Sequence, residues 1–108
     1  MIQVIKRDGK IVDFNLSKIS GAMEKAFKAT GTEYTNDILE LLSLRVTAAF
    51  QEKIADGKIG VEDIQDCVEQ VLNQAGYTEV AKAYILYRKQ HENIRNVSQT
   101  VLDYKDVI

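Results

Sequence analysis

Four stretches of the chain carry apolar residues at helical spacing, and this repeat constrains the fold more than any other feature. In residues 15–31, Ile19, Met23 and Phe27 recur four positions apart, with Ala22 and Ala26 beside them. That spacing places them on one face of a helix. The same period returns in residues 36–55, 61–75 and 78–94. We therefore expect four amphipathic helices packed around a shared apolar core.

Capping residues predict where these helices begin and end. The first is expected to start after Asn15 and to end at Gly31, and the third is expected to end at Gly76. Thr35 or Asn36 would cap the second helix, and Thr78 the fourth. The second expected helix should bury one apolar face. The residues that the spacing places on that face are Ile38, Leu39, Leu42, Val46, Ala49 and Phe50.

Residues 2–14 have the pattern of a β-hairpin rather than of a helix. β-Branched residues flank an Asp8-Gly9 pair, and Asp-Gly favours a type I′ turn with positive φ at both central positions. A second short β-type segment, residues 58–61, could add a third strand. The expected order is β-β-α-α-β-α-α, and the fold class is α+β: a four-helix bundle capped at one end by a small three-stranded sheet.

Charge is unevenly distributed. Residues 1–28 hold six basic and three acidic side chains, a net +3, whereas the remainder carries −5, giving −2 overall. A net negative chain with one positive pole is suited to a small anion rather than to nucleic acid. No apolar run is long enough for a membrane span, and the polar start is not typical of a secretory signal. A cytoplasmic protein is the expectation.

No group of residues predicts catalysis. His91 stands among charged residues on the fourth expected helix, and Cys67 is the one cysteine, which is typical of an inert thiol. A small stand-alone enzyme is therefore the weakest of three hypotheses. The other two are a nucleotide-binding regulatory module and an interaction or oligomerisation module whose nucleotide site is vestigial.

The hairpin and the first helix carry the strongest ligand signal. Lys6, Arg7 and Lys10 surround the hairpin turn, and Lys18 lies in the first turn of the following helix. A helix start exposes backbone N–H groups that favour phosphate. A lysine in that turn opposes the helix dipole unless an anion lies between them, so we expect a phosphate site here.

These residues resemble a known family. The segment V-I-K-R-D-G-K-I-V-D-F-N-L-S-K-I, residues 4–19, resembles the opening of an ATP-cone, the regulatory nucleotide-binding domain of many ribonucleotide reductases. Residues 59–72 and 80–90 are similar to later segments of that family. The resemblance covers residues 2–94.

The resemblance implies that ATP or dATP, with Mg²⁺, binds under the sheet and controls the overall activity of a reductase, and so deoxyribonucleotide synthesis. It implies a nucleotide-dependent homo-oligomer as one response. Val4 and Ile5 would lie along base and sugar, Ile19 and Ile64 would flank the base, and Asn15 would orient the nucleotide. The cationic contacts would come from Lys6, Arg7, Lys18, Arg88 and Lys89.

Three positions depart from the family pattern. Val61 stands where many relatives have Ser or Thr, Gln65 where some have His, and Val12 where some have Glu. Such differences would act on the choice between ATP and dATP or on the number of nucleotides bound.

The rest of the chain bears on the parent protein. Residues 92–108 resemble the link into an anaerobic ribonucleoside-triphosphate reductase, so we expect an ATP-cone in residues 1–94, a linker in 95–108 and a catalytic domain downstream. A repressor that also carries an ATP-cone has a four-cysteine zinc ribbon before it, which one cysteine does not match. The chain itself is not expected to be an enzyme.

Overall fold

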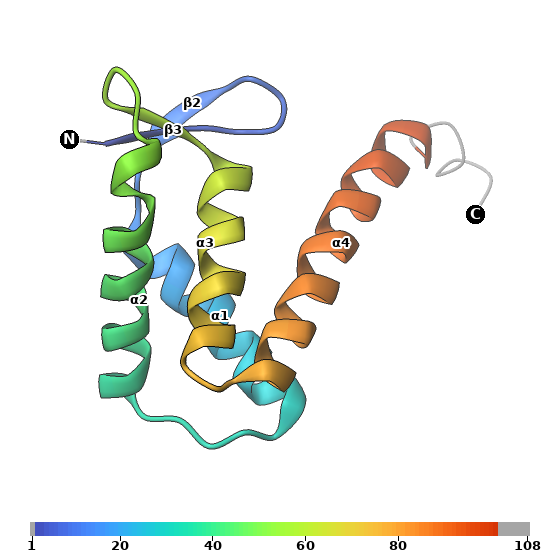
Figure 1. Cartoon of the computed structure of the whole chain (residues 1–108). Helices are drawn as coiled ribbons and strands as arrows, with labels where there is room; N and C mark the ends of the chain where they lie inside the picture. The colour runs from blue at the N-terminus through green and yellow to red at the C-terminus, as the bar shows by residue number, and fades with distance from the viewer. Residues whose placement is uncertain (1, 102–108) are drawn as a thin grey trace.

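A computed structural model describes residues 2–101, with side chains for residues 2–90. The elements follow the predicted order, and Figure 1 shows the sheet across one end of the helices. The strands are β1 (Gln3–Ile5), β2 (Ile11–Asp13) and β3 (Lys58–Gly60). The helices are α1 (Leu16–Thr30), α2 (Asn36–Phe50), the short 3₁₀ helix η1 (Gln51–Lys53), α3 (Val61–Gln74) and α4 (Thr78–Val101). The α+β prediction is confirmed.

The sheet has the order β2-β1-β3, so the N-terminal strand is central. It pairs antiparallel with β2, where Val4 lies opposite Val12, and parallel with β3, where Val4 lies opposite Ile59. A parallel pair needs a long crossover, and α1 and α2 provide it. Val4 and Ile59 are buried toward the helices, whereas Ile5 is exposed on the outer face. The third strand is thereby confirmed.

The hairpin turn differs in type from the prediction. Gly9 has φ of 87°, but Asp8 does not have positive φ. The Lys6 N–H donates to the Lys10 carbonyl at 2.8 Å and the Gly9 N–H donates to the Lys6 carbonyl at 2.9 Å. These bonds close a three-residue loop with one left-handed glycine, in which the Asp8 carboxylate accepts from the Lys10 N–H at 3.0 Å.

The type I′ geometry occurs instead at the second Asp-Gly pair. Asp56 and Gly57 have φ of 56° and 71°, and Ala55 and Lys58 exchange backbone hydrogen bonds of 2.9 and 3.0 Å around them. Asp-Gly therefore occurs at both turns, while loop length decides the turn type.

The predicted caps hold at three helix ends. Asn15 caps α1, Thr35 caps α2 through a 3.2 Å bond from the Ile38 N–H, and Gly31 ends α1 with φ of 66°. Thr78 is the exception, because it is already the first residue of α4. The Ala81 N–H donates to the Tyr77 carbonyl at 2.9 Å, so Tyr77 occupies the position before the helix. The Tyr77 ring also packs edge-on against Phe27, with centroids 5.0 Å apart, which fixes the chain there.

The core follows the predicted stripes with one replacement. Ala49 is exposed, and Ser43 is buried on the inner face of α2. The Ser43 hydroxyl donates to the Leu39 carbonyl at 2.7 Å, so its burial leaves no polar atom without a partner. The sequence pattern did not predict Ser43 in the core, because serine is polar. Its hydrogen bond to the backbone of its own helix allows it to be buried.

α4 continues beyond its expected end near Ile94, to Val101, and no glycine or proline interrupts it there. Residues 102–108 of the expected linker lie outside the described residues, so the division at residue 94 stays a prediction. α4 lies close to α3 at the turn between them and diverges from it toward its C-terminal end (Figure 1). None of the helices described is both long and apolar enough to cross a membrane.

Candidate functional site

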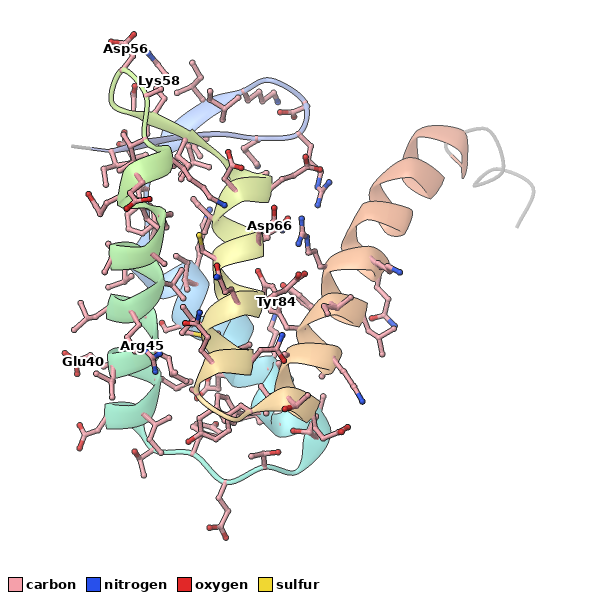
Figure 2. All side chains as sticks on the ribbon, viewed as in Figure 1. Glu40, Arg45, Asp56, Lys58, Asp66 and Tyr84 are labelled. Atoms are coloured by element: carbon pink, nitrogen blue, oxygen red, sulfur yellow. The ribbon has the colours of Figure 1, made fainter. Side chains whose placement is uncertain are left out.

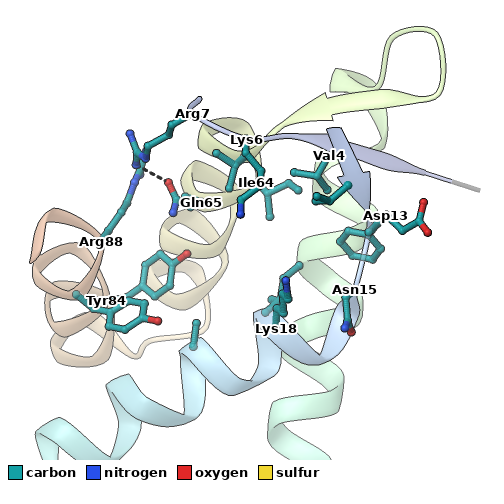
Figure 3. Close-up of a pocket in the computed structure, with 16 residues that line it drawn as sticks. Val4, Lys6, Arg7, Asp13, Asn15, Lys18, Ile64, Gln65, Tyr84 and Arg88 are labelled. Carbon is teal, nitrogen blue, oxygen red and sulfur yellow. Dashed lines mark hydrogen bonds between the residues drawn. The ribbon is translucent and has the colours of Figure 1, made fainter. Parts of the chain in front are cut away.

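A cavity of about 230 Å³ lies between the hairpin, the first turns of α1 and α3, and the middle of α4 (Figure 3). Eight of the ten predicted site residues line it. They come from the hairpin, α1, α3 and α4, so the cavity brings Arg88 together with hairpin residues that are far from it in the sequence. The eight are Val4, Lys6, Arg7, Asn15, Lys18, Ile19, Ile64 and Arg88.

Two predicted residues are not brought to the cavity. Ile5 follows Val4 in a strand, so its side chain points to the opposite face of the sheet, where it is 38% exposed. Lys89 follows Arg88 on α4 and is exposed, because successive helix residues are rotated by about 100°. The sequence motif placed both residues beside the site, but backbone geometry turns their side chains away.

Lys6 and Lys18 approach the cavity from opposite sides. Lys6 shares a strand face with Val4, and Lys18 lies in the first turn of α1 (Figure 3). Within the described residues neither amine has a hydrogen bond or an ion pair. Two ammonium groups at one small cavity repel each other, and an anion between them would remove that repulsion.

The start of α1 differs from the expectation of open N–H groups. The Ser17 N–H donates to Asn15 Oδ1 at 3.0 Å, and the Lys18 N–H donates to the Asn15 carbonyl at 3.1 Å. These two donors are therefore occupied within the helix cap. The cationic side chains, rather than the bare helix start, are what an anion would meet here.

The two arginines of the cavity both bind α3. Arg7 pairs with Glu62 and donates to Gln65 Oε1 at 2.9 Å. Arg88 Nη1 donates to Asp66 Oδ1 at 2.9 Å and to Glu69 Oε1 at 2.7 Å. The family resemblance implied that Arg88 contacts the nucleotide, whereas in the structure these two carboxylates are its partners.

The four partners share one face of α3, since positions 62, 65, 66 and 69 follow the helical repeat. We call this group the α3 counter-ion face: Glu62, Gln65, Asp66 and Glu69. Figure 2 shows Asp66 on the side of α3 that is turned toward α4. Burial is the largest influence on the Arg88 pKa and lowers it, but the bonds from Glu69 and Asp66 together raise that pKa above its ordinary value.

Sequence reasoning missed the aromatic lining. Phe14, Tyr84 and Tyr87 line the cavity, and Tyr84 is only 4% exposed. The Tyr84 and Tyr87 ring centroids are 6.3 Å apart, and Lys25 Nζ lies 5.6 Å from the Tyr87 centroid. The spacing of Tyr84, Tyr87 and Arg88 along one helix face was the available signal.

The remaining lining residues include every departure from the family pattern. Val12, Val61 and Gln65 all line the cavity, together with Asp13 and Ala22. These three positions would therefore lie beside a ligand bound in the cavity.

The acidic residues and the cysteine of the described part of the chain do not form a second candidate site. Those residues contain no group of three or more His, Cys, Asp or Glu side chains placed to hold a metal ion. Cys67 is buried, and burial is the main cause that raises its pKa. The backbone of His91 belongs to α4, and its side chain lies outside the described ones.

Comparison with known proteins gives the same family as the motif. Residues 2–93 match the ATP cone domain. The chain is 38% identical over 103 residues to the ribonucleoside-diphosphate reductase subunit alpha of Chlamydia muridarum, which covers 88% of this chain and 10% of that protein. It is 39% identical over 98 residues to the vitamin B12-dependent ribonucleoside-diphosphate reductase of Thermoplasma acidophilum, covering 86% of this chain and 12% of that protein.

A third kind of reductase is also similar. The anaerobic ribonucleoside-triphosphate reductase of Haemophilus influenzae is 34% identical over 95 residues, covering 85% of this chain and 13% of that protein. The chain spans about a tenth of the length of these relatives, and the matches do not single out one reductase type. The family match extends over nearly the whole chain, and the chain therefore belongs to the ATP-cone domain family.

Proposed function

We propose that the chain is an allosteric regulatory domain that binds ATP or dATP in the cavity beneath the hairpin. The observation that carries the proposal is the convergence of Lys6, Arg7, Lys18 and Arg88, from three elements, on one cavity in a chain of the ATP-cone family. Polyphosphates are recognised by such clusters of cations.

The cavity lining combines two kinds of chemistry. Val4, Ile19 and Ile64 contribute apolar side chains, which suit a purine, while the cations suit phosphates. Pockets that enclose a whole drug-sized ligand measure about 300–1,000 Å³, which is more than the volume found here. We infer that base and sugar fill the cavity and that the phosphates extend to the cations at its rim.

The nucleotide would bring its own metal. The cavity lining has one carboxylate, the exposed Asp13, and Mg²⁺ is usually held through few protein carboxylates and the phosphates of the substrate. The residues present therefore fit Mg²⁺ that arrives on ATP, and they do not form a separate metal site.

The proposed output is control of a linked ribonucleotide reductase in the cytoplasm. The relatives are reductases of three types, and the catalytic step would belong to another domain. The anaerobic type is our finer proposal for the parent and rests on the resemblance of residues 92–108. A reconstituted enzyme that responds to ATP and dATP, and does so only under anaerobic conditions, would support the anaerobic type.

An interaction module is the second candidate. Leu41 and Leu44 are 59% and 53% exposed on α2, and Ile11 is 50% exposed on the sheet. Contiguous exposed apolar patches are typical of association surfaces, and Leu41 and Leu44 are neighbours on one face of α2. A change in molecular mass on adding ATP or dATP would support both candidate functions at once, because a nucleotide would then control formation of the homo-oligomer.

Calorimetric and thermal titration test the binding proposal. A nucleotide that binds the folded chain at a hundredfold excess over Kd stabilises it by about 2.7 kcal/mol, so ATP or dATP should raise the melting temperature. Lys18→Ala should remove the shift, whereas Lys53→Ala, an exposed lysine on η1 outside the cavity, should keep it. No shift with either nucleotide at millimolar concentration contradicts the function, and binding by Lys18→Ala contradicts the phosphate assignment.

A further inference from the structure

The cations of the cavity fall into two classes. Lys6 and Lys18 have no ion pair within the described residues, whereas Arg7 and Arg88 are both held by the α3 counter-ion face. A polyphosphate can meet the two lysines directly. It can meet the arginines fully only by competing with the carboxylates that already hold them.

The local charge makes this competition matter. Four cations and Asp13 give the cavity lining a net +3. The three carboxylates of the α3 counter-ion face, Glu62, Asp66 and Glu69, reduce that value to zero. The carboxylates therefore reduce the attraction of the cavity for an anionic ligand, and an arginine that turns from them to the ligand would increase it.

Arg88 is the better placed of the two arginines for such an exchange. Both of its bonds to α3 leave from Nη1, and Nη2 and Nε make no further hydrogen bond within the described residues, although the side chain lines the cavity. The Arg88 side chain is 17% exposed, and its partners Asp66 and Glu69 are 55% and 23% exposed. Partly solvated ion pairs contribute about 1 kcal/mol or less, an amount that a triphosphate can replace.

Because of its position on α4, an exchange of partners by Arg88 would affect how α4 is held against α3. Val80, Ala81 and Tyr84 bury the first turns of α4 in the core, and Arg88 comes one turn after Tyr84. α4 diverges from α3 toward its C-terminal end (Figure 1). The bonds from Arg88 to Asp66 and Glu69 thus tie α4 to α3 beyond the buried first turns of α4.

We propose that Arg88 is a counter-ion switch, held by Asp66 and Glu69 when the cavity is empty and by the nucleotide's phosphates when it is filled. Nucleotide binding thereby weakens the tie between α3 and α4 and reports occupancy of the cavity to the C-terminal half of α4. Asp66 and Glu69 are positioning residues that oppose binding. The inference rests on the proposed nucleotide site and adds its regulation.

Two measurements on the whole chain test the switch. The first follows the side-chain N–H resonances of the arginines, assigned for Arg88 by Arg88→Lys, during titration with ATP and with inorganic tripolyphosphate. The second measures ATP affinity by calorimetry in the double variant Asp66→Asn/Glu69→Gln. Its control is Glu40→Gln/Glu79→Gln, which makes the same change in net charge at exposed residues outside the cavity.

The expected results are a shift of the Arg88 resonances at saturating ATP and a Kd at least about threefold lower in the double variant than in the control. Unmoved Arg88 resonances overturn the switch, and so does a Kd in the double variant that equals or exceeds that of the control. If the double variant does not fold, the resonances of the unaltered chain still decide. Absence of any ATP binding defeats the proposed function as well, whereas Lys18-dependent binding without an Arg88 response defeats the switch alone.

Discussion

Asn15 Oδ1 accepts hydrogen bonds from both the backbone N–H and the hydroxyl of Ser17, at 3.0 and 2.6 Å. One side chain thus closes the first turn of α1 and also lines the cavity in which Lys18 lies. We therefore expect Asn15 to contribute both to stability and to ligand binding, and substitutions can separate these two contributions.

Asn15→Ala should lower the free energy of unfolding by about 1 kcal/mol, because a cap acceptor is lost. Asn15→Asp should keep that stability, since aspartate caps as well, but should weaken ATP binding through the added negative charge. Urea unfolding and calorimetry measure the two quantities. Thr35→Ala is the matched control, because it removes the cap of α2 outside the cavity and should cost stability without changing Kd. Equal affinities for Asn15→Asp and the unaltered chain would remove Asn15 from the ligand's surroundings.

Filling the cavity should block the nucleotide without removing a charge. Ala22 is half-buried on α1 and lines the cavity, so Ala22→Leu places a larger apolar side chain where we expect the base. We expect ATP affinity to fall at least about tenfold, which is 1.4 kcal/mol, while the chain stays folded. Ala29→Leu, on the exposed side of the same helix, should bind as the unaltered chain does. Undiminished binding by Ala22→Leu would place the base elsewhere.

The fold was largely predictable because its signals are local. Apolar period, the Asn15 cap and the Asp-Gly pairs each act within a few residues, and each gave an element in the right place. Pairings between distant segments were not predictable in this way. The bonds from Arg7 and Arg88 to α3 span 19 to 58 positions, and no local pattern marks Asp66 or Glu69 as partners of Arg88.

The site shows the same division. The motif identified residues of the hairpin, α1 and α4 that line the cavity, whereas Ile5 and Lys89 needed backbone geometry to be placed outside it. Ser43 and Ala49 exchanged roles in the core because a serine that bonds back to its own helix is apolar in effect. Tertiary context decided each of these cases.

Stability at high pH should depend on Tyr84. Burial is the largest cause that raises its pKa above the ordinary value of 10.0. The folded phenol then keeps its proton above pH 10 while the unfolded phenol loses it, so its stabilising contribution is complete below pH 10 and declines as the pH rises further. Tyr84→Phe should reduce the decline in the free energy of unfolding by up to about 1.4 kcal/mol per pH unit above pH 10. Urea unfolding from pH 6 to pH 11 checks this. The two proteins should give parallel curves between pH 6 and 8, and parallel curves above pH 10 would contradict the prediction.

Gly57, which precedes β3, and Gly60, the last residue of β3, should respond oppositely to substitution. Gly60 precedes α3 with φ of −72° and ψ of 144°, a conformation open to any residue, and α3 has no side-chain cap. Gly60→Ser should therefore supply a cap and restrict the unfolded chain, raising the free energy of unfolding by about 0.5–1 kcal/mol. A new Cβ would lie 3.4 Å from Asp63 Oδ2, the mobile end of a side chain that can yield. Gly57→Ala is the matched comparison, because φ of 71° in its type I′ turn should cost about 1 kcal/mol. Chemical denaturation of both variants measures the difference, and a destabilised Gly60→Ser would show that Asp63 already serves the start of α3 and cannot move.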